Sequence, residues 1–282
     1  MLGGTQGFMS NATCRKEYRA SNPLAPSRAA CLELDDTTGI RLSRGRGLPW
    51  STDRWAAPRV VLTGVSPTNC VDRRPAYTGY PRLNACEFDG RLSLAQTASG
   101  SFLLYSRANL KFGAVAGGRF VQVTKSDRLD GGWTPWQPVQ ILGVDSDKMD
   151  IYTFAVQRNP VDGSSLLAVF PLTEPPWACI VIAVSIDGIK FSRPVTLRSS
   201  PFGVRPSYLS SGEHPPLEWR GEDHPCSGIL RAPGDPNRIL IYVHHAVKGT
   251  TIRKDAVPHV RVYSVLASEL QRETAAALAT LQ

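Results

Sequence analysis

The sequence predicts an all-β fold built from repeated four-stranded units. Glycine (24 residues) and proline (22 residues) are spread over all 282 positions, and both weaken or break helices. From about residue 60 onward, short apolar runs alternate with turn-forming residues, which is the pattern of many short strands. Two stretches of about fifty residues also repeat the same order of strands and turns, as structural repeats do.

The N-terminal part of the chain differs from the rest in its pattern of apolar residues and breakers. Residues 1–58 have weak apolar periodicity and many breakers, including Pro23, Pro26 and Pro49. We expect them to form an irregular extension, and residues 59–282 to form the β domain. A strand over 59–65 is expected to belong to a degenerate first unit of that domain.

The two regular units are defined by their alternation and turns. In the first, Leu92 and Leu94 alternate with Ser93 and Ala95, and a Ser-Gly turn follows at 99–100. The strands expected in the first unit are 91–96, 102–108, 119–125 and 136–142. Those expected in the second are 151–157, 165–170, 179–185 and 191–197.

A third, less regular unit and a helix complete the chain. Its expected strands are 227–231, 238–246 and 259–265. From Ser268 onward, leucines and alanines are spaced as on a short helix, with Leu270, Leu278 and Leu281 as its apolar positions.

Four-stranded units of this length are typical of the blades of a β-propeller, in which each blade packs against its neighbours. Three units are visible, and a closed ring needs more. We therefore expect five blades, with six as the alternative, and at least one degenerate blade from the segment before residue 80.

Both regular units carry a similar turn after their third strand. Residues 126–136 read SDRLDGGWTPW and residues 185–191 read SIDGIKF, each with Ser, then Asp-Gly, then an aromatic residue. This pattern resembles the Asp-box of sialidase-type propellers, where the Asp side chain bonds local amides and the aromatic packs beneath. The first copy has extra residues before its Asp-Gly, and the second has Phe191 where Trp is usual. The resemblance covers roughly residues 80–265 and implies architecture rather than chemistry.

Acidic residues recur where the first strand of each unit should begin. Asp89 precedes the first unit, Asp150 the second, and Glu222 with Asp223 the third. Glycoside hydrolysis needs two converging carboxyl groups, one to protonate the leaving oxygen and one to attack or to activate water. A third carboxylate would raise the pKa of the proton donor by like-charge repulsion.

This arrangement is similar to that of the five-bladed glycosidases that act on arabinans, xylosides and fructosides. The resemblance implies Asp89 as base or nucleophile, Asp150 as the tuning and orienting acid, and Glu222 or Asp223 as proton donor. The Asp-Pro signatures usual in those families are absent around Asp89 and Asp150.

The sialidase resemblance implies a different set, in which arginines clamp a substrate carboxylate. Arg82 lies in a Tyr-Pro-Arg-Leu stretch before the first unit, and Arg107 follows its second strand. His224 lies beside Asp223, where an imidazole can bond a sugar hydroxyl or tune its acidic neighbour. The candidate substrate-binding residues are Arg82, Arg91, Arg107, Arg205 and His224.

A non-catalytic interpretation stays open beside the enzymatic one. Asp before a strand is a common turn residue, and Arg on a strand is often solvent-facing. The alternative function is therefore a propeller that binds a glycan or a protein partner without cleaving it.

Several other functions are not expected. The net charge of +8 comes from dispersed residues, so we expect no nucleic-acid partner, and no apolar run is long enough for a membrane span. The six cysteines show no two-residue spacing, and no phosphate-binding loop occurs, so we expect neither metal nor cofactor. A monomer is expected. Residues 1–10 contain no apolar signal region, so the compartment is left open, with a secreted or endomembrane location expected if the N-terminus is incomplete.

Overall fold

The computed structural model describes residues 2–4, 39–42, 59–63, 70–71, 88, 92–110, 118–174, 177–196, 223–245 and 259–281. In these residues the fold is mostly β, with one helix, α4 (Ala267–Ala279), at the C-terminal end. This confirms the all-β class and the short terminal helix. No helix in this part of the chain is long and apolar enough to cross a membrane.

The first sheet is a four-stranded antiparallel sheet in the order β4-β5-β6-β7. Its strands are β4 (Ser93–Gln96), β5 (Phe102–Asn109), β6 (Arg119–Ser126) and β7 (Gln137–Pro138). The first three strands confirm the sequence prediction. The fourth was predicted over 136–142 and is wrong in part, because β8 (Gln140–Ile141) leaves the sheet and pairs in parallel with β13 (Lys190–Phe191).

Proline explains where this fourth strand divides. Pro138 has no backbone N–H and cannot donate to the ladder with β6. After it, the Val139 amide still donates to the Val121 carbonyl at 3.1 Å, and the Gln140 amide donates to the Ile189 carbonyl at 2.9 Å. The chain thus crosses from the first sheet toward the second.

The second sheet has the order β10-β11-β12-β14, with β9 also paired to β11. Its strands are β9 (Asp150–Ile151), β10 (Ala155–Arg158), β11 (Leu166–Glu174), β12 (Trp177–Ser185) and β14 (Val195–Thr196). The first strand predicted over 151–157 is therefore interrupted at 152–154. At this break Phe154 enters the core, where its ring lies 4.9 Å from Phe170 and 5.2 Å from Phe191 between centroids.

The third sheet consists of β15 (Asp223–Ala232), β16 (Asp235–His245) and β17 (His259–Leu266) in that order. Helix α4 follows β17 directly and buries Leu270, Thr274 and Ala277, which are spaced four and three residues apart on one helix face. This face packs into the core shared by the second and third sheets.

Part of the segment expected to be irregular forms strands. β2 (Gly39–Leu42) pairs with β1 (Leu2–Gly4) on one side and with β3 (Arg59–Thr63) on the other, in a three-stranded antiparallel sheet here called the N-terminal sheet. Ile40 of β2 packs with Phe88, Leu104 and Trp136, so this sheet adjoins the first sheet. The domain boundary at residue 58 stays a prediction.

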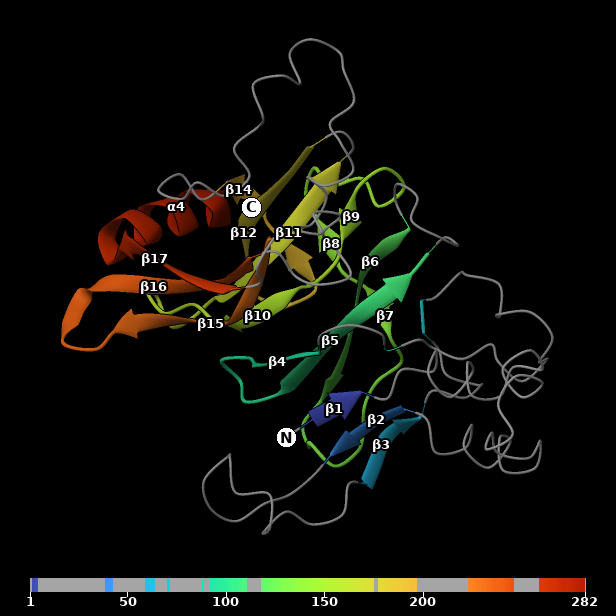
Figure 1. The fold of residues 1–282 in the computed structure, drawn as a ribbon. Coiled ribbons are helices and arrows are strands. Elements are labelled where there is room, and N and C mark those ends of the chain that lie inside the picture. Colours follow the sequence, from blue (N-terminus) through green and yellow to red (C-terminus); the bar gives the residue numbers. More distant parts are fainter. Residues whose placement is uncertain are drawn as a thin grey trace, which may run out of the picture.

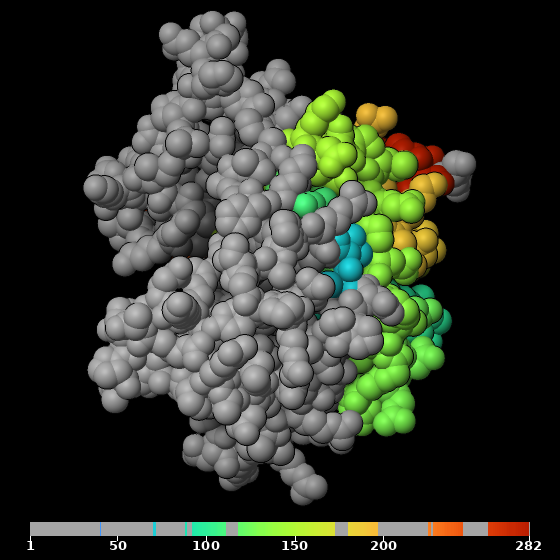
Figure 2. Space-filling model, turned by 90° about the vertical axis from the view of Figure 1, so that its right-hand side faces the viewer, coloured from blue at the N-terminus to red at the C-terminus, as the bar shows by residue number. Residues whose placement is uncertain are grey.

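The sheets follow one another in chain order. Figure 1 shows the N-terminal sheet at the bottom, the first sheet beside it, the second above and the third at the left, with α4 next to it. A short segment at 70–71 also joins the first sheet, where the Val71 amide donates to Gln122 Oε1 at 2.9 Å, and Cys70 is disulfide-bonded. Figure 2 shows this segment in cyan against the green surface. Ring closure and blade number stay predictions.

The first strands of the three sheets lie side by side through side-chain bridges. Ser93 Oγ accepts from the Val156 amide at 2.8 Å and donates to the Val156 carbonyl at 3.2 Å. In the same way, the Gln157 side chain accepts from the Ile229 amide at 2.6 Å and donates to the Ile229 carbonyl at 2.7 Å. β4, β10 and β15 therefore run as neighbours, as first strands do in consecutive blades.

The two serine-aspartate turns are held by local hydrogen bonds. Asp187 Oδ1 accepts from the amides of Ile189 and Lys190, while Ser185 Oγ accepts from Gly188 at 2.8 Å. In the first unit, Ser126 Oγ accepts from the Arg128 amide at 3.0 Å and donates to the Gly131 carbonyl. Of the aromatic residues after the turns, Trp136 and Phe191 are buried and Trp133 is half-buried.

Gly188 is the position where the second turn requires glycine. Its φ is +77°, and a Cβ there would collide with Leu103 Cδ1 and lie 2.7 Å from the Tyr105 hydroxyl.

We expect Gly188→Ala to lower the free energy of unfolding by about 2 to 5 kcal/mol, since it combines left-handed strain with overpacking. Gly163 has a φ of +69° with open space around it. Gly163→Ala is thus the matched control, with an expected loss of only about 1 to 2 kcal/mol in urea unfolding. Equal losses would contradict this account.

Tyr105 should make stability sensitive to alkaline pH. Burial raises its pKa well above the usual value, and the Asp187 carboxylate raises it further, while its hydroxyl donates to the Gly188 carbonyl at 2.9 Å. The unfolded chain releases this proton near the ordinary tyrosine pKa of about 10. Stability is therefore complete below that pH and falls as pH rises above it. We expect the free energy of unfolding of Tyr105→Phe to fall less than that of the wild type as the pH rises above the ordinary tyrosine pKa. An equal fall in both proteins would contradict this.

Candidate functional site

The described part of the candidate site lies where the first strands begin. In the first sheet, this is the end at which β5 ends and β6 begins. β9, which begins the second sheet, lies at the same end. Asp150 is the first residue of β9, and Arg107 is near the end of β5. Of the predicted site residues, these two are described with their side chains.

Asp150 is tied to the first sheet through a backbone hydrogen bond. Its Oδ1 accepts from the amide of Arg119, the first residue of β6, at 2.9 Å. This contact fixes one carboxylate oxygen and joins the beginnings of β6 and β9. Asp150 is only half-buried, so its position is compatible with contact to a ligand.

Tyr152, in the break after β9, has two arginine side chains close to its ring. The Arg107 guanidinium lies 4.2 Å from the centre of the Tyr152 ring, and the Arg119 guanidinium 5.6 Å from it. Arg107 Nη2 also donates to the Tyr152 carbonyl at 3.3 Å. We call Arg107, Arg119, Asp150 and Tyr152 the arginine-tyrosine cluster.

The members of this cluster differ in exposure. Arg107 is only 5% exposed, whereas Arg119, Asp150 and Tyr152 are half-buried. Arg119, Tyr152 and Asp150 are therefore the members that a ligand could contact directly. Arg107 packs against the Tyr152 ring. Two guanidinium groups, a carboxylate and a phenol together offer donors and acceptors suited to hydroxyl and carboxylate groups.

Sequence reasoning missed Arg119 and Tyr152. Arg119 is one of many dispersed arginines, and its role depends on the pairing of β5 with β6, which places it opposite Asn109. Tyr152 was expected within a continuous strand, and the interruption at 152–154 gives it a different environment. A tyrosine two residues after the candidate acid Asp150 was the available signal.

The remaining predicted site residues are described incompletely or not at all. Asp223 and His224 begin β15, and their backbones pair with His245 and His244 of β16. Asp223 was expected to precede the first strand and instead is its first residue. The residues outside the described part are Asp89, Glu222, Arg82, Arg91 and Arg205. Their convergence with Asp150 stays a prediction.

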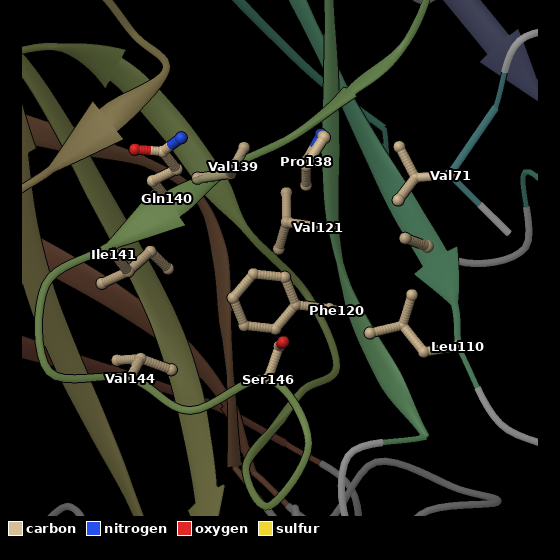
Figure 3. Close-up of a pocket in the computed structure, with 11 residues that line it drawn as sticks. Val71, Leu110, Phe120, Val121, Pro138, Val139, Gln140, Ile141, Val144 and Ser146 are labelled. Carbon is tan, nitrogen blue, oxygen red and sulfur yellow. The ribbon is translucent and has the colours of Figure 1, made fainter. Parts of the chain in front are cut away.

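An apolar pocket of about 330 Å³ lies near the cluster but does not include it. It opens where the chain crosses from β7 to β8, and Figure 3 shows the Phe120 ring in the middle of its lining. Ala108 and Phe120, which line it, adjoin Arg107 and Arg119 in sequence, and Gln140 and Ser146 supply polar groups. Among the described residues that line this pocket, none is Asp or Glu. Within the described ranges, no three His, Cys, Asp or Glu residues are grouped so as to hold a metal ion.

No protein-family model matches the sequence, and no curated protein matches it either. Solved structures do resemble the fold. One is the Hadza microbial sialidase Hz136, with 14% identity, a TM-score of 0.40, and coverage of 62% of this chain and 35% of that one. Another is the α-L-arabinanase of Cellvibrio cellulosa, with 15% identity, a TM-score of 0.39, and coverage of 62% and 51%.

A protein of unknown function from Dyadobacter fermentans is also similar, with 18% identity, a TM-score of 0.45, and coverage of 82% of this chain and 49% of that one. The chain thus spans between about a third and a half of the length of these three proteins. Both enzyme types that the sequence resembles, sialidases and arabinanases, are among the similar structures. With TM-scores below 0.5, these likenesses are partial and assign no activity.

The stacking of Arg107 on Tyr152 should contribute to stability. We expect Tyr152→Leu to lower the free energy of unfolding by about 1 to 2 kcal/mol, because it removes a partly desolvated cation–π contact while keeping an apolar side chain. Tyr152→Phe keeps the ring and is the matched control, with little expected change. Urea unfolding of both variants measures the difference, and an equal loss in both would show that the ring face is not the stabilising element.

Proposed function

We propose that the chain is a glycoside hydrolase-like β-propeller that binds a carbohydrate where the first strands of its sheets begin. The observation that carries this proposal is the arginine-tyrosine cluster, because it combines an oriented carboxylate with two guanidinium groups and an aromatic ring. Carbohydrates present hydroxyl groups and, in acidic sugars, a carboxylate to such donors and acceptors. The neighbouring positions of β4, β10 and β15 support the propeller arrangement, with five blades and Asp-box turns as its finer features.

Hydrolysis by converging carboxylates is the catalytic part of the proposal. Asp89 is the base or nucleophile, Asp150 the tuning and orienting acid, and Glu222 or Asp223 the proton donor. The contact between Asp150 and the Arg119 amide supports an orienting role, since one oxygen is already engaged by the protein. Arg82, Arg91, Arg205 and His224 are proposed to contact the substrate, and the buried Arg107 is proposed to act on it by holding Tyr152 in place. The reaction is proposed to use no cofactor.

A non-catalytic propeller that binds a glycan or a protein is the second candidate. It is favoured by the burial of Arg107, which packs against Tyr152, and by the apolar lining of the nearby pocket. The two candidates predict different results with the same variants, because only the enzyme needs a charged carboxylate for a chemical step.

Asp150→Asn tests the enzymatic proposal with little disturbance of the fold. The asparagine carbonyl can still accept from the Arg119 amide, while the negative charge is lost. We expect kcat/KM for an aryl sialoside, arabinoside or fructoside surrogate to fall by about 10²- to 10⁴-fold, the range for loss of a group that assists proton transfer.

Asp147→Asn is the matched control, because Asp147 is an exposed carboxylate three residues away. It should leave activity unchanged. Full activity in Asp150→Asn would contradict the proposed role of Asp150. A wild type that binds glycans, cleaves none of them, and loses binding on Asp150→Asn would establish the non-catalytic candidate instead.

A further inference from the structure

Arg119 carries a guanidinium that has no hydrogen-bond acceptor among the described residues. Its backbone amide donates to Asp150 Oδ1 at 2.9 Å, but the ion pairs of the described residues do not include its side chain. The guanidinium lies 5.6 Å from the centre of the Tyr152 ring. A guanidinium has five N–H donors, and a contact with a ring face uses none of them in a conventional hydrogen bond. Its donors are therefore available to another molecule.

Other arginines of the described residues are engaged by the protein. Arg238 lies 3.3 Å from the Asp235 carboxylate, at a site on the third sheet. Arg107 is only 5% exposed and donates to the Tyr152 carbonyl at 3.3 Å. Arg119 is half-buried, so it combines access for a ligand with partial removal from water.

The position of Arg119 places this guanidinium in the candidate site. Arg119 is the first residue of β6 and pairs with Asn109, the last residue of β5. Asp150 begins β9 and is joined to the Arg119 amide. A ligand group held by the guanidinium would therefore lie close to the proposed orienting acid.

The Tyr152 ring restrains the guanidinium without neutralising it. A cation–π contact leaves the full positive charge on the arginine, unlike an ion pair with a carboxylate. The ring itself is packed against Arg107, whose guanidinium lies 4.2 Å from its centre. Arg119 is thus partly pre-organised, which lowers the entropy cost of ordering its side chain when a ligand binds.

A guanidinium in this state suits a carboxylate better than a neutral hydroxyl group. Its planar fork matches the two oxygens of a carboxylate in a pair of parallel hydrogen bonds. Partial burial strengthens such a contact, because water competes less for the same donors. The net charge of +8 on the chain also favours the approach of an anionic ligand.

We propose that Arg119 binds the carboxylate of an acidic sugar, and that this contact makes the site select acidic over neutral carbohydrates. The inference rests on the proposed carbohydrate site and names the class of its ligand. Arg119 takes the carboxylate-binding role that the sequence analysis expected of Arg107, because Arg107 is buried against Tyr152. The carboxylate belongs to a uronic acid within a sugar chain or to a terminal sialic acid, and the test below separates these two sources.

Isothermal titration calorimetry of the full chain with matched pairs of ligands tests the proposal. Trigalacturonate is compared with its methyl ester, which has the same sugar chain without the charges, and sialyllactose is compared with lactose. We expect the wild type to bind at least one of the two acids about tenfold or more tightly than its neutral counterpart, as expected for a charge-assisted hydrogen bond. The acid that binds identifies the source of the carboxylate.

Arg119→Met removes the guanidinium and keeps an unbranched side chain of similar reach. We expect the affinity for the acid to fall about 10- to 100-fold, the range for loss of hydrogen bonds to a charged group, while the affinity for the neutral counterpart changes little. Arg119→Lys keeps the positive charge without the planar fork, so it should recover only part of the loss.

Lys125→Met is the matched control, since Lys125 is an exposed cation near the opposite end of β6 and its removal lowers the net charge equally. It should leave the affinity for the acid unchanged. An equal loss in Lys125→Met and Arg119→Met would assign the effect to net charge and overturn the role of Arg119.

The remaining outcomes separate this inference from the proposed function. Equal binding of acids and neutral counterparts, or an affinity for the acid that survives Arg119→Met, overturns the inference and leaves the carbohydrate site standing. A wild type that binds none of the four ligands overturns both.

Discussion

The first strand of each sheet is an edge strand, and its outward backbone groups must find partners beyond their own sheet. Ser93 and Gln157 meet this constraint by bonding both the amide and the carbonyl of one residue, Val156 and Ile229 respectively. Arg158 and Arg231 add a second link, donating to the Thr97 and Pro160 carbonyls of the preceding sheet. These bridges place β4, β10 and β15 side by side, so that the beginnings of the sheets gather at one end of the molecule.

The candidate site depends on this alignment. Because β9 begins beside the β5–β6 end, the Asp150 carboxylate reaches the Arg119 amide, and the interruption after β9 brings the Tyr152 ring close to two guanidinium groups. The same interruption sends Phe154 into the aromatic core with Phe170 and Phe191. One break in a strand thus contributes both to the packing between the sheets and to the arrangement of the arginine-tyrosine cluster.

Local sequence patterns predicted the elements that depend on residues close to one another in the sequence. β5, β6 and the terminal helix follow from apolar spacing, and the second turn follows from its Asp-Gly pair. The divided fourth strand was not predicted, since β8 pairs with β13 from the next unit, a contact that no local pattern encodes. Asp150 was found because the sequence places it where a strand should begin, and it is the first residue of β9. Arg119 and Tyr152 were missed because their proximity results from strand pairing and an interruption.

The central claim is that the acids at the beginnings of successive sheets converge. A crystal structure of the full chain, measuring the distances between the carboxyl groups of Asp150, Asp89 and the Glu222-Asp223 pair, tests it most directly. The account predicts that at least two of these groups lie within about 5 to 10 Å of each other in an open pocket, as paired glycosidase carboxylates do. Carboxylates scattered beyond that range, or each engaged in turns of its own, would contradict the catalytic account.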